Sequence, residues 1–371
     1  MIKIYLQNIK LSQFRSYNYL DLSFSPSTNI LCGKNAQGKT NIVEAIHYFS
    51  TLKSHRFVSD KELILSECDV ANMQISYQKH PTSRVEKMKI GLSKNSKSAK
   101  RELSKNDVKT DNASFLGEFH SVLFSPEDLN LIKGDKEQRR RFLDSDVCQI
   151  RPRYYKILKY YNSILRNRNK LLKEEHPDET LLQVYTEKLV EFGTEVIIYR
   201  ALFVERLKET AKKIYAEIAG ETEELNLRYE SELFDTFVED KAAIREMFHQ
   251  KLSEVAKEEH LFHTTRVGPH RDDLEFYLND KNAKIYASQG QQRTIILALK
   301  LSELLFIKEL TGSYPVLLLD DILSELDKTR QKSLFSYIKP CQTIITITDA
   351  QAFEVEGAKT FLVENSVVTE Q

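Results

Sequence analysis

Hydrophobic and polar residues alternate with a period of two along the first part of the chain. The alternation predicts three β-strands that lead into a glycine-rich loop, at residues 2–11, 20–24 and 28–32. A helix is expected to follow from Lys39 to about Ser50, and two more strands are expected at residues 72–78 and 86–92. The amino-terminal third is therefore predicted to be mixed α and β structure.

The pattern changes in the middle of the chain. From Tyr154 to about His260, apolar residues recur every three or four positions, as in long amphipathic helices, and Pro177 separates two of them. After Gly268 the chain returns to strands, at residues 314–320, 342–348 and 359–363. We therefore expect one α/β lobe formed by residues 1–133 and 262–371, with residues 134–261 inserted as a helical lobe.

The composition is that of a globular protein, with 41% hydrophobic and 29% charged residues over 371 positions. We find no signal-peptide pattern at the start and no apolar run long enough to span a membrane, so we expect a cytoplasmic location. The four cysteines are Cys32, Cys68, Cys148 and Cys341. They lie far apart in the sequence and lack neighbouring histidines, so neither a disulfide framework nor a zinc site is predicted.

The formal net charge is zero, but the charges are segregated along the chain. Residues 133–173 contain 13 Lys and Arg against 4 Asp and Glu, whereas residues 174–260 contain 11 against 22. A basic segment next to an acidic one favours a surface directed at a charged partner. The alternative is that both segments are solvated helix faces that partly neutralise each other.

A complete phosphate-binding motif follows the third predicted strand and precedes the predicted helix. In such a loop, backbone N–H groups surround the β-phosphate of a nucleotide, and the helix dipole adds favourable charge. Lys39 is expected to contact the β- and γ-phosphates, and Thr40 to bind Mg²⁺ through its hydroxyl. The expected ATP-binding residues are Gly33, Lys34, Asn35, Ala36, Gln37, Gly38, Lys39, Thr40 and Asn41.

A second nucleotide element lies about 280 residues further along, where an apolar strand ends in two carboxylates. Asp320 is expected beside the Mg²⁺ ion, and Asp321 near the γ-phosphate, where a carboxylate can deprotonate the attacking water. Taken alone, the Asp-Asp pair would also fit a helix cap after a strand. Together with the phosphate-binding loop, it predicts the Walker B strand of an ATPase.

The long separation between these motifs excludes compact GTPase-like or kinase-like layouts and favours a P-loop ABC-type ATPase head. Just upstream of the Walker B strand, a loop that resembles the signature loop of ABC ATPases precedes a predicted helix. We call it the signature-type loop. By this resemblance, we expect Ser288, Gly290 and Gln291 to contact the γ-phosphate held by another protomer. Such a serine is also common as a simple helix cap. The switch histidine of transporters is absent, and Thr348 or Asp349 is a candidate replacement.

Several motifs in order resemble the RecF family of bacterial recombination and repair proteins. They extend over nearly the whole chain and are together more specific than the phosphate-binding loop alone. They are Asn35-Ala36-Gln37-Gly38-Lys39-Thr40-Asn41, Phe124-Ser125-Pro126-Glu127-Asp128-Leu129, Arg139-Arg140-Arg141-Phe142-Leu143-Asp144, Val267-Gly268-Pro269-His270-Arg271-Asp272-Asp273-Leu274, Ser288-Gln289-Gly290-Gln291-Gln292-Arg293 and Leu319-Asp320-Asp321-Ile322-Leu323-Ser324-Glu325-Leu326-Asp327.

The resemblance implies a two-lobed head related to those of Rad50 and the structural-maintenance proteins. It implies a homodimer that forms with ATP, binds double-stranded DNA at gaps or junctions, and helps the RecO and RecR proteins to load RecA. Most ABC ATPases have a glutamate at the position of Asp321, and the shorter side chain implies slow, weak DNA-stimulated hydrolysis. The glutamine of an ABC Q-loop is not identifiable in the sequence.

The basic segment supplies the candidate DNA contacts. Lysine and arginine contacts to phosphates give sequence-neutral, salt-sensitive affinity. The expected contacts are Arg139, Arg140, Arg141, Arg151 and Arg153, followed by Lys156, Lys159, Arg166 and Arg168. Any one of these residues could instead form a surface ion pair. For the Gly268-Pro269-His270-Arg271 segment two interpretations also stay open: a functional role for His270 and Arg271, or only a tight turn.

Three functions remain open on the sequence. The first is an ATP-switched DNA clamp that slow hydrolysis resets. The second is a structural DNA-binding scaffold without hydrolysis, which the complete set of Lys39, Thr40, Asp320 and Asp321 disfavours. The third is an ABC transporter subunit, which the helical insertion and the missing switch histidine disfavour.

Overall fold

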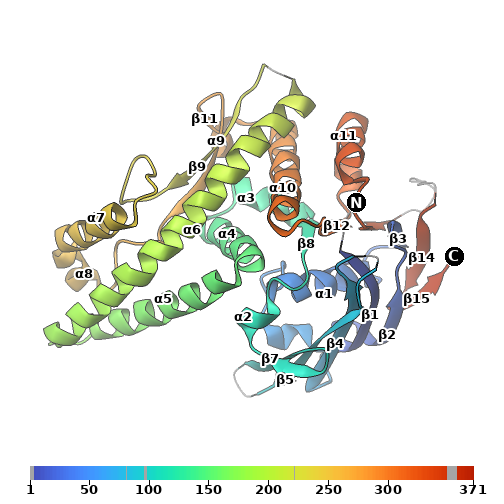
Figure 1. Cartoon of the computed structure of the whole chain (residues 1–371), viewed down its shortest axis with the longest axis horizontal. Helices are drawn as coiled ribbons and strands as arrows, with labels where there is room; N and C mark the ends of the chain where they lie inside the picture. Colours follow the sequence, from blue (N-terminus) through green and yellow to red (C-terminus); the bar gives the residue numbers. More distant parts are fainter. Residues whose placement is uncertain (1–3, 81, 96–97, 221, 349–356) are drawn as a thin grey trace. The chain divides into compact units, whose positions relative to one another are not determined.

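The computed structural model describes residues 4–80, 82–95, 98–220, 222–348 and 357–371 (Figure 1). The chain divides into two compact units. The first unit comprises Met1–Leu129, Glu217–Gly220 and Arg293–Gln371, and the second comprises Asn130–Ala216 and Glu221–Gln292. Each unit is described by itself below.

A six-stranded sheet forms the centre of the first unit. Its strands lie in the order β15-β14-β3-β13-β12-β8, and all neighbours are parallel except β15, which pairs antiparallel with β14. The bounds are β3 Thr28–Cys32, β8 Ser121–Phe124, β12 Val316–Asp320, β13 Thr343–Ile347, β14 Lys359–Glu364 and β15 Val367–Glu370. Every residue of β8, β12 and β13 is buried, which explains their continuous apolar runs.

A second sheet in the same unit is antiparallel, in the order β2-β1-β4-β5-β6-β7. Buried Ile9 and Leu11 alternate along β1 with the polar residues Asn8, Lys10 and Ser12, which is the predicted period of two. The bounds are β1 Tyr5–Phe14, β2 Tyr17–Ser23, β4 Val70–Gln78, β5 Glu86–Lys94, β6 Ala99–Lys105 and β7 Val108–Thr110. The predicted strands and their mixed α/β setting are therefore confirmed.

Helices complete the first unit. The helix α1, at Lys39–Thr51, contacts β8, β12 and β13 of the parallel sheet, and its buried side chains include Ile42, Val43 and Ile46. The long helix α10, at Gln289–Thr311, enters the first unit at Arg293. The remaining helical elements are η1 Asp60–Leu63, α2 Asn112–Phe115, η2 Pro126–Leu129, η3 Leu323–Glu325 and α11 Lys328–Ile338.

The second unit is mainly helical. Its two longest helices, α5 at Pro152–Leu171 and α6 at Glu179–Ala219, are joined by a hydrogen bond from Arg168 Nε to Thr186 Oγ1 and by stacking of Tyr160 on Phe192. The shorter helices are α3 Asn130–Lys133, α4 Lys136–Ile150, α7 Lys241–Glu254, α8 Ala256–Phe262 and α9 Ala283–Tyr286.

The second unit differs from the predicted helical insertion, residues 134–261, in its bounds and in its strands. It begins at Asn130 and leaves Glu217–Gly220 to the first unit. It contains a three-stranded sheet in the order β11-β10-β9, with bounds β9 Leu225–Glu230, β10 Asp273–Leu278 and β11 Lys281–Asn282. Because β10 pairs with β9, residues 262–292 belong to this unit rather than to the α/β lobe. The boundary predicted at residue 262 is thus moved to Arg293. Among the described residues, no helix has both the length and the apolar character needed to cross a membrane.

Candidate nucleotide-binding site

Residues 33–38 form the loop that joins β3 to α1. The cap residue of α1 is Gly38, with φ 109°, and no side chain caps the first turn of the helix. The backbone of Ala36 is also left-handed, with φ 64°. An uncapped helix start leaves its first N–H groups available to an anion, which is the arrangement expected for a phosphate site.

Glycine is needed at both ends of the loop, because a Cβ atom at either position would lie too close to neighbouring atoms. A Cβ atom at Gly33 would lie 2.2 Å from the carbonyl oxygen of Val363, and one at Gly38 would lie 2.8 Å from the hydroxyl of Tyr17. That hydroxyl donates a 3.2 Å hydrogen bond to the carbonyl of Gly38. The first contact is with backbone, which cannot swing away, so a side chain at Gly33 would displace either the loop or β14.

The turn between β14 and β15 supports the loop from the side, a role that the sequence did not reveal. The N–H of Asn365 donates to Gln37 Oε1 at 2.5 Å, and the N–H of Ser366 donates to the carbonyl of Gln37 at 3.1 Å. Both turn residues are left-handed, with φ of 48° and 60°. The signal available in the sequence is an Asn-Ser pair between two short apolar runs, which is typical of a tight hairpin.

Lys39 is buried at the start of α1, with 6% of its surface exposed. Its ammonium donates hydrogen bonds to the carbonyls of Gly33, at 2.5 Å, and Lys34, at 2.9 Å. Burial lowers the pKa of Lys39, and the negative charges of Asp321 and Asp320 oppose that shift. The lysine is thus held over the loop, where phosphate oxygens would replace the two carbonyls.

The side chains of Thr40 and Asp320 meet at the carboxyl end of β12. Thr40 Oγ1 donates to Asp320 Oδ1 at 3.0 Å, and Thr346 Oγ1 donates to the same oxygen at 2.7 Å. Burial raises the pKa of Asp320, and these two hydrogen bonds lower it. The role of Thr346 as a partner of the carboxylate is not predicted by the sequence.

This oxygen pair fits Mg²⁺. The ion is usually held by one or two protein oxygens, with phosphates and waters completing its octahedron. In the described part of the chain, no group of three or more His, Cys, Asp or Glu side chains could hold a metal ion. Thr40 and Asp320 would hold the ion, as expected from the sequence.

Asp321 follows the Walker B strand in a left-handed conformation, with φ 52°. Its N–H donates to Thr346 Oγ1 at 2.9 Å, so one threonine of β13 supports both carboxylate residues. A non-glycine residue held in this region of φ is strained, and such strain is often found at functional sites. Thr348, the candidate γ-phosphate sensor, lies just beyond β13, and Asp349 lies outside the described residues.

The segment after β8 begins at the carboxyl edge of the parallel sheet. Phe124 of β8 pairs in register with Leu319 of β12, so both strands end at the same edge of the sheet. The residues that follow are Ser125, Pro126 and Glu127, without a glutamine. The charge of Glu127 adds to the rise in the pKa of Asp320, so this segment places an acidic side chain near the Walker B carboxylate.

The signature-type residues lie at the start of α10, in the second unit. The N–H of Ser288 donates to Gln291 Oε1 at 2.7 Å, and the N–H of Gln291 donates to Ser288 Oγ at 3.3 Å. This reciprocal pair is a capping box. Gln291 Nε2 also donates to Glu223 Oε1 at 2.6 Å. Ser288 therefore caps its helix here, and a contact of Ser288, Gly290 or Gln291 with nucleotide stays a prediction.

Two of the predicted DNA contacts are buried in ion pairs. Arg139 is buried and makes a bidentate pair with Asp273, with Nε to Oδ1 at 2.7 Å and Nη2 to Oδ2 at 2.9 Å. Arg168 is buried too and pairs with Glu259 at 2.6 Å. Because both guanidinium groups are enclosed and satisfied by carboxylates of the second unit, we expect them to stabilise the fold, and a contact of either with DNA stays a prediction.

The other basic residues differ in their exposure. Arg140 is partly buried and donates to the carbonyl of Asp272 at 3.0 Å, while Arg141 is exposed and pairs with Glu137 of the same helix. Arg151 and Arg153 are exposed at the start of α5, and Lys156, Lys159 and Arg166 are exposed further along the same helix. The exposed residues of α5 are therefore the stronger candidates for a phosphate contact.

The Gly268-Pro269-His270 turn is a structural element of the second unit. The carbonyl of Pro269 accepts a hydrogen bond from Arg200 Nη1, and the ring of His270 lies between the hydroxyl of Tyr161, at 2.6 Å, and the carbonyl of Thr265, at 3.1 Å. Burial lowers the pKa of His270 to about 4, so its ring is neutral at pH 7. The turn therefore organises the core.

Replacing Arg139 by alanine should destabilise the protein by about 3–5 kcal/mol, because the buried carboxylate of Asp273 loses its bidentate partner and keeps only the exposed Lys136, 3.8 Å away. Urea unfolding measures the change. The control is Arg141→Ala, on the exposed side of the same helix, which should change stability by less than about 0.5 kcal/mol. An Arg139→Ala protein of normal stability but weakened duplex binding would show instead that Arg139 contacts DNA.

Comparison with known proteins agrees with this geometry. The family described as "RecF/RecN/SMC N terminal domain" matches residues 5–367. A protein of Clostridium perfringens named "DNA replication and repair protein RecF" is 39% identical over 366 residues, covering 98% of this chain and 97% of the relative. A protein of the same name from Exiguobacterium sp. is 40% identical over 372 residues, covering 98% and 99%. This chain belongs to the RecF family.

Solved structures extend the comparison to three dimensions. The RecF-family chain superposes on a structure described as the recombination mediator protein RecF with ATP, in the RecFOR pathway, with a TM-score of 0.93 and 34% identity, over 100% of this chain and 98% of the other. An Smc head domain derived from Pyrococcus furiosus matches with a TM-score of 0.54 and 15% identity, over 99% and 96%. The second likeness concerns the fold alone. The fold is thus the predicted ABC-type ATPase head.

Proposed function

We propose that this RecF-family chain is an ATP-dependent DNA-binding protein of recombinational repair. The observation that carries the proposal is the set formed by Lys39, Thr40, Asp320 and Asp321, which brings a phosphate-binding loop, a Mg²⁺ pair and a candidate base together in one unit. The names of the relatives, which describe replication, repair and a RecF bound to ATP, support the same reading. Such a protein acts in the cytoplasm.

The proposed reaction is slow hydrolysis of ATP. The loop N–H groups and Lys39 would bind the β- and γ-phosphates. Thr40 and Asp320 would hold a Mg²⁺ ion, which would supply positive charge beside the phosphates. Asp321 orients the attacking water and accepts its proton. Its side chain is shorter than the glutamate of most ABC ATPases, so we expect weak turnover, stimulated by DNA.

We further propose that ATP drives formation of a homodimer that clamps double-stranded DNA at gaps or junctions. Each ATP would lie between the phosphate-binding loop of one protomer and Ser288, Gly290 and Gln291 of the other. Hydrolysis would open the dimer and release the DNA. As the family resemblance implies, the clamp would act with RecO and RecR to promote the loading of RecA.

Two alternatives are separated by one experiment. A scaffold that only binds nucleotide would form DNA complexes without turnover, and an ABC transporter subunit would turn over ATP without responding to DNA. The clamp requires both turnover that rises with duplex DNA and a dimer that appears with ATP. Steady-state ATPase assays and sedimentation, each with and without a short duplex, decide among the three.

Charge reversal of Arg151 and Arg153 together should weaken duplex binding about equally for all sequences. The slope of log affinity against log salt should fall by about one unit per lost phosphate contact, because fewer counterions are released. Titration of a labelled duplex at several salt concentrations measures both effects. Changing two exposed lysines of the first unit, Lys61→Glu with Lys332→Glu, gives a control with the same change in net charge. If both double variants lose affinity equally, α5 is not the DNA contact.

A further inference from the structure

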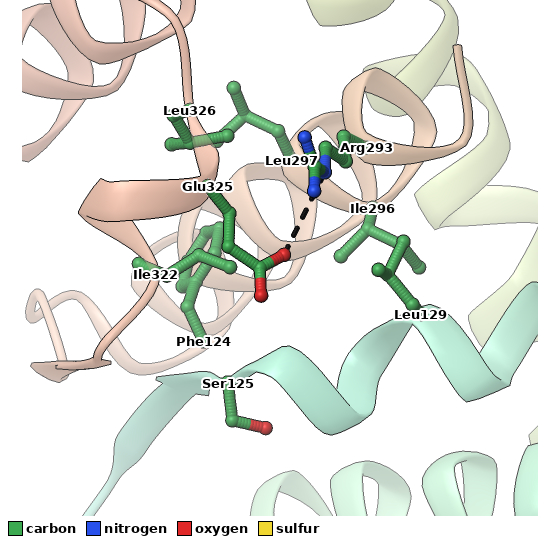
Figure 2. A pocket seen from close by; sticks show the side chains of 9 residues that line it. All are labelled: Phe124, Ser125, Leu129, Arg293, Ile296, Leu297, Ile322, Glu325 and Leu326. Atoms are coloured by element: carbon green, nitrogen blue, oxygen red, sulfur yellow. Dashed lines mark ion pairs between the residues drawn. The ribbon is translucent and has the colours of Figure 1, made fainter. Parts of the chain in front are cut away.

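Three segments of the first unit surround a small pocket, which Figure 2 shows in close view. They are the segment after β8, the part of α10 that begins at Arg293, and the residues that follow Asp321. The apolar lining consists of Phe124, Leu129, Ile296, Leu297, Ile322 and Leu326. Arg293 and Glu325 add an ion pair of opposite charges to this apolar lining.

The ion pair is loose. Arg293 Nε lies 3.7 Å from Glu325 Oε2, which is too far for a hydrogen bond, and the two side chains are 38% and 26% exposed. Glu325 Oε2 is itself buried and has no hydrogen-bond partner among the described residues. A buried acceptor without a donor is unusual and costly in a folded protein. A shift of about 1 Å would bring the pair within the normal hydrogen-bond range.

The segment that carries Glu325 is fixed at its other contacts. Gln331 Nε2 of α11 donates to the carbonyls of Leu323, at 2.8 Å, and Leu326, at 3.1 Å. Ser324 Oγ donates to the carbonyl of Asp321 at 3.0 Å. Movement of residues 323–326 is therefore tied to the conformation of Asp321, the candidate base.

A second contact connects the same regions. Arg330 Nε of α11 donates to Thr294 Oγ1 of α10 at 2.8 Å, and Thr294 is buried. Two consecutive residues of α10 thus contact elements that follow Asp321 in the chain. Arg293 lies near Glu325 of η3, and Thr294 bonds to Arg330 of α11. Arg293 is also the first residue of α10 within the first unit, whereas Ser288 and the rest of the helix start belong to the second.

We propose that Arg293 and Glu325 are positioning residues that couple the conformation of Asp321 to the amino-terminal part of α10. When bound nucleotide shifts the segment after Asp321, the pair closes to a direct hydrogen bond and holds the start of α10 in the orientation that hydrolysis requires. The inference rests on the proposed ATPase function and adds two residues that do not themselves touch nucleotide.

The test uses Glu325→Gln, Arg293→Gln and the charge-swapped double variant Glu325→Arg with Arg293→Glu. ATP affinity, measured with a slowly hydrolysed analogue, should stay within about twofold of the original protein. Turnover should fall about tenfold in each single variant, and the swapped pair should recover at least half of it. A control is Glu205→Gln on α6, whose ion pair with Lys208 also spans 3.7 Å, with Glu205 48% exposed.

Hydrogen exchange supplies a readout that does not depend on turnover. It is measured on dilute, monomeric protein, because the proposed dimer contact would itself protect the first turns of α10. Bound analogue should slow exchange in residues 322–327 and in the first turns of α10 together, and Glu325→Gln should abolish the change in α10 while retaining it in residues 322–327. Unchanged α10 protection in that variant, or turnover equal to that of Glu205→Gln, overturns the coupling. A protein that stays monomeric with ATP but loses α10 protection on Glu325→Gln would refute the dimer while supporting the coupling.

Discussion

Replacing Lys39 by alanine is expected to reduce ATP affinity by a factor on the order of 10² or more. Two charge-assisted hydrogen bonds to phosphate oxygens are lost, each contributing about 1.5–3 kcal/mol. The ammonium already lies over the loop, bonded to the carbonyls of Gly33 and Lys34, so its position is set before the nucleotide arrives. Calorimetric titration with ATP and Mg²⁺ measures the loss.

The folded state should survive this substitution. Burial lowers the pKa of Lys39, which means that the fold holds the charged ammonium at a cost, and alanine removes that cost. Thermal unfolding without nucleotide should therefore stay close to that of the original protein. Lys53→Ala, an exposed lysine just after the same helix, serves as the control. Undiminished ATP affinity in folded Lys39→Ala would refute the assignment of the phosphate-binding loop.

Replacing Ser288 by arginine is expected to lower hydrolysis by a factor on the order of 10³, while ATP binding to the monomer stays intact. In the proposed dimer, the start of α10 from one protomer contacts the γ-phosphate held by the other, and the long side chain blocks that approach. Turnover per chain in the original protein should rise with protein concentration. Single-turnover assays and sedimentation with ATP measure the two consequences.

The capping box makes a control necessary, because Ser288 and Gln291 exchange hydrogen bonds at the helix start. Ser288→Ala removes the cap without adding bulk and should cost only about 1 kcal/mol of stability. Ser253→Arg places the same arginine on an exposed part of α7 and should leave turnover unchanged. If Ser288→Arg forms a normal ATP-dependent dimer with full turnover, Ser288 is a cap only and the composite site is wrong.

Mixing two inactive variants sharpens this test. A heterodimer of Ser288→Arg and Lys39→Ala retains one complete site, built from the phosphate-binding loop of the first protomer and the signature-type loop of the second. Partial recovery of turnover on mixing is expected if one site can close alone. If each ATP site were formed within a single chain, mixing the two variants would not restore turnover.

Local patterns determined most of the first unit. The alternation in β1 and the apolar runs of β12 and β13 are set by which faces of each strand are buried, so they are visible in the sequence. The phosphate-binding loop and the Walker B strand were identified for the same reason, because nucleotide chemistry requires those residues at those spacings. Their meeting across 280 positions, through Thr40 and Asp320, is a tertiary fact that agrees with the prediction.

Only the tertiary structure decided which charges are structural and which partners support the site. Arg139 and Arg153 look alike in a basic segment, but one is enclosed by Asp273 and the other is exposed, because burial depends on what packs against each helix. Likewise, β9 pairs with β10, more than forty residues away in the sequence, and the N–H of Asn365, near the carboxyl-terminal end of the chain, donates to Gln37. Such contacts join distant segments through packing and leave no local period in the sequence, so the sequence determined the chemistry and the fold determined which residues perform it.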